Sequence, residues 1–326
     1  MNSRPPLRLG GKRVRPGERK RVELPVARIT TGDWLALSVE VLHGRGPGPT
    51  LWLTGAIHGD EIDGIEIIRR ILTRLDTGTL NGTIIAVPVV NLFGFVSESR
   101  YLPDRRDLNR SFPGSTTGSL AARLARMLMD EVVARGDWGL DFHCGSDKRE
   151  NLPQVRADLD DDETRRIARV FGAPVTIHGR APDGALRKAA LEADCRTLVY
   201  EAGEAGRFTE SAIRRGVDGV ARVLRTLGMT DGGAGLAPGT AADTPPATVE
   251  SRRTRWVRAA RSGICRIEVE LGQRVRKGQA VGEITDPFGD GGETLAARCD
   301  GIVIGRRVNP LVYQGEAVVH LAEVDG

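Results

Sequence analysis

Between about residues 22 and 228, short apolar runs rich in β-branched residues alternate with amphipathic segments. Apolar runs bounded by turn residues predict strands, and apolar residues that recur every three to four positions predict helices. The predicted strands are 34–42, 50–57, 83–90, 138–143, 174–178 and 196–202, and the predicted helices are 61–75, 119–135, 161–171, 184–193 and 209–227. Strands and helices that alternate in this way are typical of an α/β domain.

The pattern changes after Gly228. A segment rich in Gly, Ala, Pro and Thr has few large apolar residues and predicts a linker at 231–248. The residues that follow form short alternating runs with glycine at the corners, which predicts a small β barrel or sandwich at 249–326. Its phrases "ELGQRVRKGQAVGEI" and "CDGIVIG" resemble the hammerhead of biotinyl and lipoyl carrier domains, but no lysine stands at the expected hairpin tip. A structural or gating module is therefore favoured over a swinging-arm carrier. An N-terminal arm at 1–21 and a main domain at 22–230 complete the predicted organisation.

Composition indicates an ordinary soluble globular protein, because 40% of the 326 residues are hydrophobic and 28% are charged. No apolar run approaches the roughly 20 residues that span a bilayer, and the N-terminus has no apolar signal region. A cytoplasmic protein with no membrane partner is therefore expected. The cysteines lack CxxC spacing, so they are expected to be reduced thiols rather than zinc ligands or disulfides: Cys144, Cys195, Cys265 and Cys299.

The formal net charge of +4 raises the question of nucleic-acid binding. Only five of the 47 basic residues are lysine, and the arginines are spread along the chain apart from short clusters such as 252–261. Aromatic residues make up only 4% of the chain, which leaves little material for base stacking. No nucleic-acid partner is expected.

The stretch "GAIHGDEIDG" places His58 and Glu61 just after the predicted strand 50–57. Ligands bind α/β sheets at the carboxyl ends of strands, and side chains three positions apart in a first helical turn can converge. Imidazole and carboxylate are both good zinc ligands, although a catalytic zinc needs a third protein ligand. The alternative is an exposed loop histidine beside a helix whose early acids favour the helix dipole.

A third ligand candidate is His143 in "GLDFHCGS", at the end of the predicted strand 138–143. Asp141 lies two residues earlier on the same strand face, and a carboxylate beside a ligating imidazole fixes its tautomer. Cys144 is expected to point to the opposite face. The other histidines lack such neighbours and are interpreted as structural: His43, His178 and His320.

Two further segments carry candidate chemistry. The loop 99–115, "SRYLPDRRDLNRSFPGS", is dense in arginine, whose planar fork suits carboxylates, although it could also be a solvated surface loop. Glu201 in "LVYEAGE" stands at the end of a strand, where an acid is awkward unless it faces a polar site. That position suits a general base.

The motifs HxxE, DLNR, DxH and a glutamate in YEAG occur in this order, and the chain resembles the succinylglutamate desuccinylase and aspartoacylase family. These proteins are relatives of the zinc carboxypeptidases. The resemblance covers about 50–227, and an appended β domain is also typical of the family. It implies a zinc-carboxypeptidase-like mixed β-sheet flanked by helices, with a small C-terminal all-β barrel or hammerhead-like domain.

The resemblance implies that His58, Glu61 and His143 bind one Zn²⁺ per chain. Cobalt or manganese would also be accepted by such ligands. Glu201 matches the family's catalytic glutamate, which activates the attacking water and then protonates the leaving nitrogen.

The remaining matches concern the substrate. Asn109 and Arg110 match residues that hold a substrate carboxylate, and Arg187 matches a further carboxylate-binding arginine. Arg100 matches the arginine that stabilises the developing oxyanion. The spacing between Arg100 and DLNR is longer than in aspartoacylase, so two other arginines compete for the same role: Arg105 and Arg106. Tyr313 matches a tyrosine that the C-terminal domain contributes.

The favoured function is a zinc-dependent deacylase that cleaves the amide bond of an N-acyl amino acid or a similar small anionic amide. One alternative is a carboxypeptidase-like hydrolase of a peptide or an oligo-glutamyl chain. Another is a noncatalytic module that binds an anion or a partner on the same fold. The sequence leaves open a homo-oligomer and does not define the acyl group or the amino acid.

Overall fold

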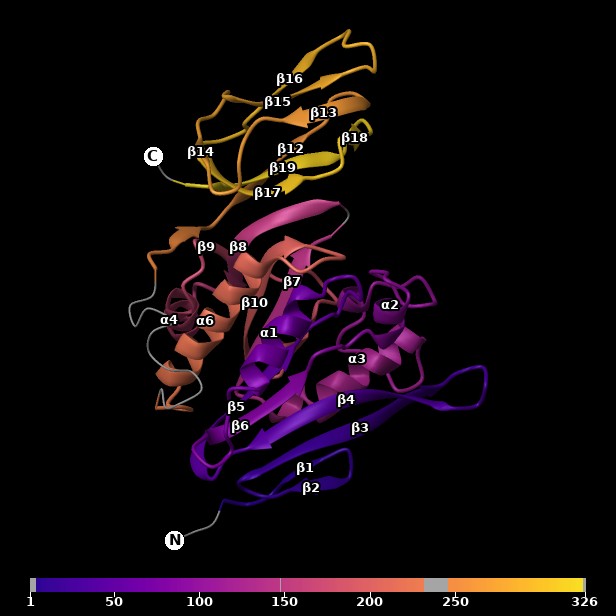
Figure 1. The fold of residues 1–326 in the computed structure, drawn as a ribbon, viewed down its shortest axis with the longest axis vertical. Coiled ribbons are helices and arrows are strands. Elements are labelled where there is room, and N and C mark those ends of the chain that lie inside the picture. The colour runs from indigo at the N-terminus through magenta and orange to yellow at the C-terminus, as the bar shows by residue number, and fades with distance from the viewer. Residues whose placement is uncertain (1–3, 147, 232–245, 325–326) are drawn as a thin grey trace.

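The structure is a computed structural model that describes residues 4–146, 148–231 and 246–324. A mixed sheet of thirteen strands runs through the molecule in the order β12-β19-β17-β8-β10-β7-β5-β6-β4-β3, with β9, β11 and β14 paired off this path (Figure 1). Its strands before the linker are β3 (Glu18–Arg28), β4 (Trp34–His43), β5 (Gly46–Thr54), β6 (Asn81–Val87), β7 (Trp138–Gly145), β8 (Arg149–Ala157), β9 (Val175–His178) and β10 (Arg196–Glu204). The predicted mixed α/β fold is confirmed.

Helices cover both faces of the central strands. The five long helices agree with the predicted ones: α1 (Asp63–Leu72), α3 (Leu120–Glu131), α4 (Asp162–Phe171), α5 (Leu186–Glu192) and α6 (Glu210–Thr226). The sequence did not predict the short helix α2 (Leu92–Val96) or the 3₁₀ turns Leu108–Arg110 and Val133–Arg135. Alternate residues of each strand enter different cores, because strand side chains alternate in direction. Leu51 and Leu53 pack with α1, α4 and α6, whereas Trp52 packs with α3 and α5.

Four strands were absent from the predicted set for the region before the linker. The predicted N-terminal arm contains the hairpin β1 (Leu7–Leu9) and β2 (Lys12–Val14) and the start of β3, which pairs along its length with β4. Strand β8 has the sequence RENLPQVRA, which lacks apolar alternation, yet it pairs with both β10 and β17. Its pairing partners, rather than its own pattern, make it a strand.

Residues 246–324, hereafter the C-terminal segment, contain strands and no helix in the part that the structure describes. The strands are β11 (Val249–Ser251), β12 (Thr254–Arg258), β13 (Gly263–Ile267), β14 (Arg274–Val275), β15 (Ala280–Thr285), β16 (Glu293–Ala296), β17 (Gly301–Arg307), β18 (Leu311–Val312) and β19 (Ala317–Glu323). A separate sheet, β16-β15-β13-β18, encloses an apolar core together with β12, β17 and β19. Most of the predicted linker, 232–245, lies outside the described residues.

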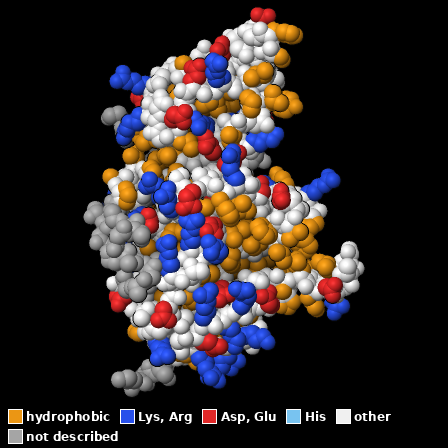
Figure 2. Space-filling model, in the orientation of Figure 1, with side chains coloured by type: hydrophobic (Ala, Val, Ile, Leu, Met, Phe, Trp, Pro, Cys, Tyr) orange, Lys and Arg blue, Asp and Glu red, His pale blue; other side chains and the backbone are white. Residues whose placement is uncertain are grey.

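The surface and the remaining predictions can be checked on the described ranges. Basic and acidic side chains are interspersed on the face shown in Figure 2, so the charge is not gathered there into one basic band. Across 4–146, 148–231 and 246–324, no helix combines the length and the apolar character needed to cross a membrane. All four cysteines are free and buried, as expected for reduced thiols.

Candidate active site

The parallel strands β5 and β7 lie next to each other and end at the same edge of the sheet. His58 and Glu61 lie in the turn between β5 and α1, and His143 lies near the end of β7. Ligands of α/β proteins bind at this edge because loops from several strands meet there. The fold therefore brings together the three residues that the sequence selected as metal ligands.

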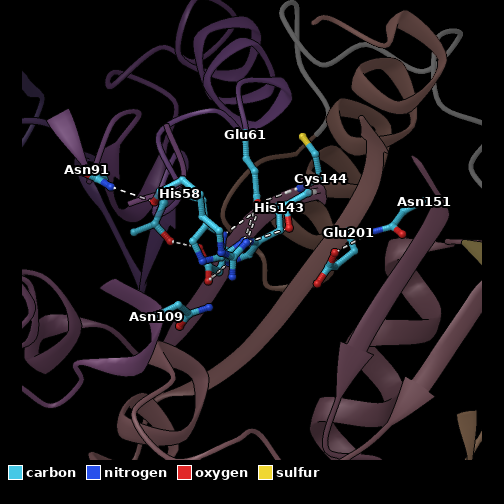
Figure 3. A network of polar contacts seen from close by, with 12 residues as sticks. His58, Glu61, Asn91, Asn109, His143, Cys144, Asn151 and Glu201 are labelled. Atoms are coloured by element: carbon cyan, nitrogen blue, oxygen red, sulfur yellow. Dashed lines mark hydrogen bonds and ion pairs between the residues drawn. The ribbon is translucent and has the colours of Figure 1, made fainter. Parts of the chain in front are cut away.

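These three side chains converge on one another (Figure 3). Nδ1 of His58 lies 2.7 Å from Oε1 of Glu61, and Nδ1 of His143 lies 2.7 Å from Oε2 of the same carboxylate. The three side chains are at most 5% exposed, and one ligand atom from each lies within 4.8 Å of the others. Two imidazole nitrogens and a carboxylate at this spacing form a group that could hold a metal ion.

Carboxylates behind the two imidazoles fix their orientation. Nε2 of His58 lies 3.1 Å from Oδ1 of Asp107, and Nε2 of His143 lies 2.9 Å from Oδ2 of Asp141. Asp141 also accepts a hydrogen bond of 2.8 Å from the hydroxyl of Thr54. A carboxylate that accepts the Nε2 proton leaves the Nδ1 lone pair directed at the centre of the group. The sequence predicted this role for Asp141 but not for Asp107.

The electrostatics of the group fit a shared cation. Burial raises the pKa of Glu61, but His58 and His143 outweigh it and hold that pKa well below its usual range. Burial lowers the pKa of His143, but Asp141 and Glu61 raise it well above its usual value. Neutral imidazoles with their Nδ1 lone pairs against carboxylate oxygens would need a positive charge between them. A proton on an imidazole or a metal ion bound by all three residues would supply it, and His₂Glu is a known ligand set for catalytic zinc.

Arg100 lies at the rim of the group. Its Nη1 lies 3.3 Å from Oε1 of Glu61, and the same nitrogen donates a 2.8 Å hydrogen bond to the Ser146 hydroxyl. Its Nη2 donates a 2.8 Å hydrogen bond to Oδ2 of Asp107. The competitors in the same loop do not line the cavity described below: Arg105 and Arg106. The geometry therefore favours Arg100 as the arginine at the centre.

Glu201 lies on β10, in register with His143 on β7, so the two side chains project from the same face of the sheet. The side-chain amide of Asn151 donates a 2.8 Å hydrogen bond to Oε2 of Glu201, and Nε of Arg156 lies 3.5 Å from Oε1 (Figure 3). No hydrogen bond or ion pair joins Glu201 to the described metal-ligand candidates. Glu201 is thus placed beside the cluster, as a base would be, and not within it.

The candidate substrate-binding residues are Asn109, Arg110 and Arg187. Oδ1 of Asn109 accepts a 2.8 Å hydrogen bond from the backbone of Leu186, which fixes its side chain. Arg110 donates from Nη1 to the carbonyl of Asn109 at 2.7 Å. Nη2 of Arg187 donates to a backbone carbonyl at 2.6 Å, and burial, with the charge of Arg156, lowers the Arg187 pKa to about 10. A mostly buried guanidinium beside another cation favours an incoming anion.

One cavity of about 560 Å³ joins all of these groups. Its lining includes all the proposed metal ligands, the proposed base and the candidate arginines and asparagine: His58, Glu61, Arg100, Asn109, Arg110, His143, Arg187 and Glu201. The volume is in the range of pockets for small molecules. The predicted set therefore shares a single site of suitable size.

The C-terminal segment supplies part of the same cavity, but through residues that the sequence did not select. Trp256 on β12 and His320 on β19 stack with ring centroids 4.0 Å apart, and the Arg149 guanidinium lies 5.5 Å from the Trp256 ring. Both aromatic residues line the cavity. Burial, with the charges of Arg156 and Arg149, lowers the pKa of His320 to about 3, so this ring is neutral.

Two of the histidines interpreted as structural also line the cavity. His178 accepts a 3.0 Å hydrogen bond from the backbone of Leu159, and both His178 and His320 reach the cavity because β9 pairs with β8 and β19 pairs with β12. His43 is bonded to Thr83 and to a backbone carbonyl and lies away from the cavity. Tyr313 is 73% exposed and does not line the cavity, so the contribution expected of it is absent here.

A mixed α/β sheet thus carries, at its carboxyl edge, a buried His–Glu–His group that could hold a metal ion beside a cavity of small-molecule size. The model of the succinylglutamate desuccinylase/aspartoacylase catalytic domain matches residues 47–227. The chain belongs to this family, as its motifs predicted.

Similar proteins extend the match to nearly the whole chain. N-alpha-acetyl-L-2,4-diaminobutyric acid deacetylase of Halomonas elongata is 30% identical over 316 residues, which cover 93% of this chain and 90% of that protein. The crystal structure of succinylglutamatedesuccinylase/aspartoacylase from Rhodobacter sphaeroides has a TM-score of 0.83 at 28% identity and covers 94% of this chain and 96% of its own. The product-bound ectoine utilization protein EutE (DoeB) from Ruegeria pomeroyi shares the fold, with a TM-score of 0.82 at 24% identity over 94% and 95% of the two chains. The relative at 30% identity is a deacetylase and the family consists of hydrolytic deacylases, which supports an amide hydrolase.

Proposed function

We propose that the protein is a zinc-dependent deacylase that hydrolyses the amide bond of an N-acyl amino acid. The observation that carries this proposal is that the His58–Glu61–His143 group, Arg100 and Glu201 line one cavity. The family of the chain and the deacetylase at 30% identity support the same reaction class. The reaction consumes one water and yields a carboxylate and a free amine.

His58, Glu61 and His143 would hold the zinc ion, with Asp107 and Asp141 orienting the two imidazoles. Bound zinc would supply Lewis acidity toward the acyl carbonyl and lower the pKa of water. Proton transfer and stabilisation of the developing negative charge would be carried out by side chains around the ion.

Glu201 would take a proton from the attacking water and deliver it to the departing nitrogen, which leaves as an amine. The Arg100 guanidinium, held by Ser146 and Asp107, would donate hydrogen bonds to the oxygen that gains negative charge. Both groups are restrained before substrate binds, so little reorganisation is needed during the reaction.

Asn109 and Arg110 would bind the substrate carboxylate, and Arg187 would bind a further anionic group. Arginine suits this role because its planar fork matches a carboxylate in two hydrogen bonds. The cavity volume of about 560 Å³ fits a small amide and favours it over a long peptide. We assign the main domain to 22–230 and a C-terminal β domain to 249–326.

The test is a panel of N-acetyl and N-succinyl amino acids together with short peptides, assayed for released amine with metal-free and zinc-loaded protein. Zinc-dependent release from N-acyl amino acids is expected. Release from peptides alone would favour the carboxypeptidase-like alternative. Zinc binding without hydrolysis of any substrate would favour a noncatalytic binding module.

A further inference from the structure

Asn151 occupies a junction in the sheet. On β8 it is paired with Gly203 of β10 on one side and with Gly305 of β17 on the other. Strand β10 carries Glu201, and β17 belongs to the C-terminal segment. One side chain thus lies between the proposed base and the C-terminal strands.

The contact between Asn151 and Glu201 has a defined direction. A carboxylate can only accept a hydrogen bond, so the Asn151 amide nitrogen must face Oε2 of Glu201, at 2.8 Å. The amide oxygen of Asn151 then points away from Glu201. Hydrogen bonds to a charged group are stronger than neutral ones, so this bond restrains the rotamer of the Glu201 carboxylate.

Gly305 lies where the amide oxygen of Asn151 points. A Cβ atom at position 305 would lie 2.9 Å from Oδ1 of Asn151 and 3.4 Å from Cβ of His320. The backbone of Gly305 is not in the left-handed region, so glycine is not needed for its backbone conformation. It is needed because a larger side chain would crowd the Asn151 amide. The amide of Asn151 is the group that can move, and its movement would break the bond to Glu201.

We propose that Asn151 is a positioning residue for Glu201, and that β17 sets its position because Gly305 leaves room for the amide. This proposal rests on Glu201 being the base of the proposed reaction. It gives the C-terminal segment a part in catalysis: β17 holds the residue that aims the base. Among the described residues, the side chain of Asn151 is hydrogen-bonded to Glu201 and to none of the proposed metal ligands or carboxylate-binding arginines.

The first experiment removes the donor. Asn151→Ala and the isosteric Asn151→Asp should each lower kcat by roughly tenfold or more, the effect of losing one charge-assisted hydrogen bond. KM and zinc content should stay near the wild-type values. A merely structural role would spare Asn151→Asp, which keeps the shape, so wild-type kcat in that variant would overturn the proposal.

The second experiment uses a double-mutant cycle. Gly305→Ala should lower kcat in the wild-type background by displacing the Asn151 amide, and it should have little further effect in an Asn151→Ala background. The control is Leu321→Ala, which removes a fully buried side chain from the core of the C-terminal segment. That variant should lower Tm but keep kcat.

The outcomes separate the two proposals. Independent, multiplicative effects of Gly305→Ala and Asn151→Ala would overturn the coupling through β17. If Leu321→Ala reduced kcat as much as Gly305→Ala, general destabilisation would explain both. If Glu201→Gln retained full activity, the proposed function would fail first, whatever the Asn151 variants did.

Discussion

The two sides of the cavity are built differently. The proposed metal corner, hereafter the metal corner, consists of His58, Glu61, His143, Asp107 and Asp141. All but the partly exposed Asp107 are buried, and each member has a partner within the group. The far wall comes from β8 and the C-terminal segment and consists of Arg149, Asn151, Arg156, Trp256 and His320. Its contacts include ring stacking, a cation–π contact, a hydrogen bond to Glu201 and an ion pair to the same carboxylate. The proposed metal ligands are therefore held by a dense buried network, whereas the wall holds the proposed base through a few separate contacts.

The largest expected effect comes from the corner itself. His143→Ala removes one of three ligands and leaves Glu61 without its second imidazole. Zinc should be lost together with activity, which should fall by about a thousandfold or more, since a catalytic metal contributes several kcal/mol. Metal analysis of the purified variant checks this. Full zinc occupancy in His143→Ala would show that the corner is not the metal site.

Glu201→Gln tests whether Glu201 acts as a base and not as a metal ligand. The variant keeps the size of the side chain but cannot take a proton, so kcat should fall by roughly 10² to 10⁴. Zinc content should not change, because Glu201 has no contact with the ligand candidates. Loss of zinc in this variant would make Glu201 a ligand and remove the distinction between base and metal corner.

Asp141→Asn weakens the corner without removing a ligand. Asp141 accepts hydrogen bonds with both carboxylate oxygens, one from His143 and one from Thr54. Asparagine has only one acceptor oxygen, so one of these bonds would be lost. Zinc affinity should fall by roughly 10- to 100-fold, as for other changes behind metal ligands. Competition with a chelator measures it. Asp104→Asn, in an exposed loop pair, is the matched control and should leave the affinity unchanged.

Arg110→Lys tests whether Arg110 recognises the substrate carboxylate, without changing the proposed metal ligands or base. Lysine cannot reproduce the paired hydrogen bonds of arginine, so kcat/KM for a substrate with a free carboxylate should fall by roughly tenfold. The amidated analogue should be affected much less. Comparing both substrates in both proteins gives the coupling between Arg110 and the carboxylate. A coupling near zero with intact zinc would reopen the substrate class.

The smallest effect concerns the attachment of the C-terminal segment. Glu250 on β11 bonds to Arg165 and Arg169 of α4, and these contacts lower its pKa to about 2. Its stabilisation is complete above the unfolded pKa of about 4.3 and disappears as the pH falls toward 2. Glu250→Gln should therefore lower the free energy of unfolding at pH 7 by at most about 1 kcal/mol, which appears as a slightly lower Tm. The Tm difference from the wild type should vanish as the pH falls through about 2. An equal Tm difference at both pH values would contradict the ionic origin.

The sequence predicted the corner better than the wall for a physical reason. His58, Glu61 and His143 stand directly after apolar strands, and parallel strands bring such positions to one edge. Asp107 was missed because only the folded loop brings it to His58. Strand β8 carries Pro153 and polar residues, so neither its strand character nor the position of Asn151 could be read locally. Trp256 and His320 reach the cavity because β19 pairs with β17, which in turn pairs with β8 across more than a hundred residues, and such non-local pairings leave no local pattern.

The pairing of β17 with β8 also constrains how the protein assembles during synthesis. Chains emerge from the ribosome at about 5 to 20 residues per second, so the segments of the metal corner are exposed well before His320. Until β17 arrives, residues Arg149–Asn151 of β8 present an unpaired strand edge. Non-local pairing of this kind is slow, and an open edge invites association with other chains. The enzyme therefore completes its catalytic wall last, and a chain stopped before β17 would carry the metal-binding motifs together with an aggregation-prone edge.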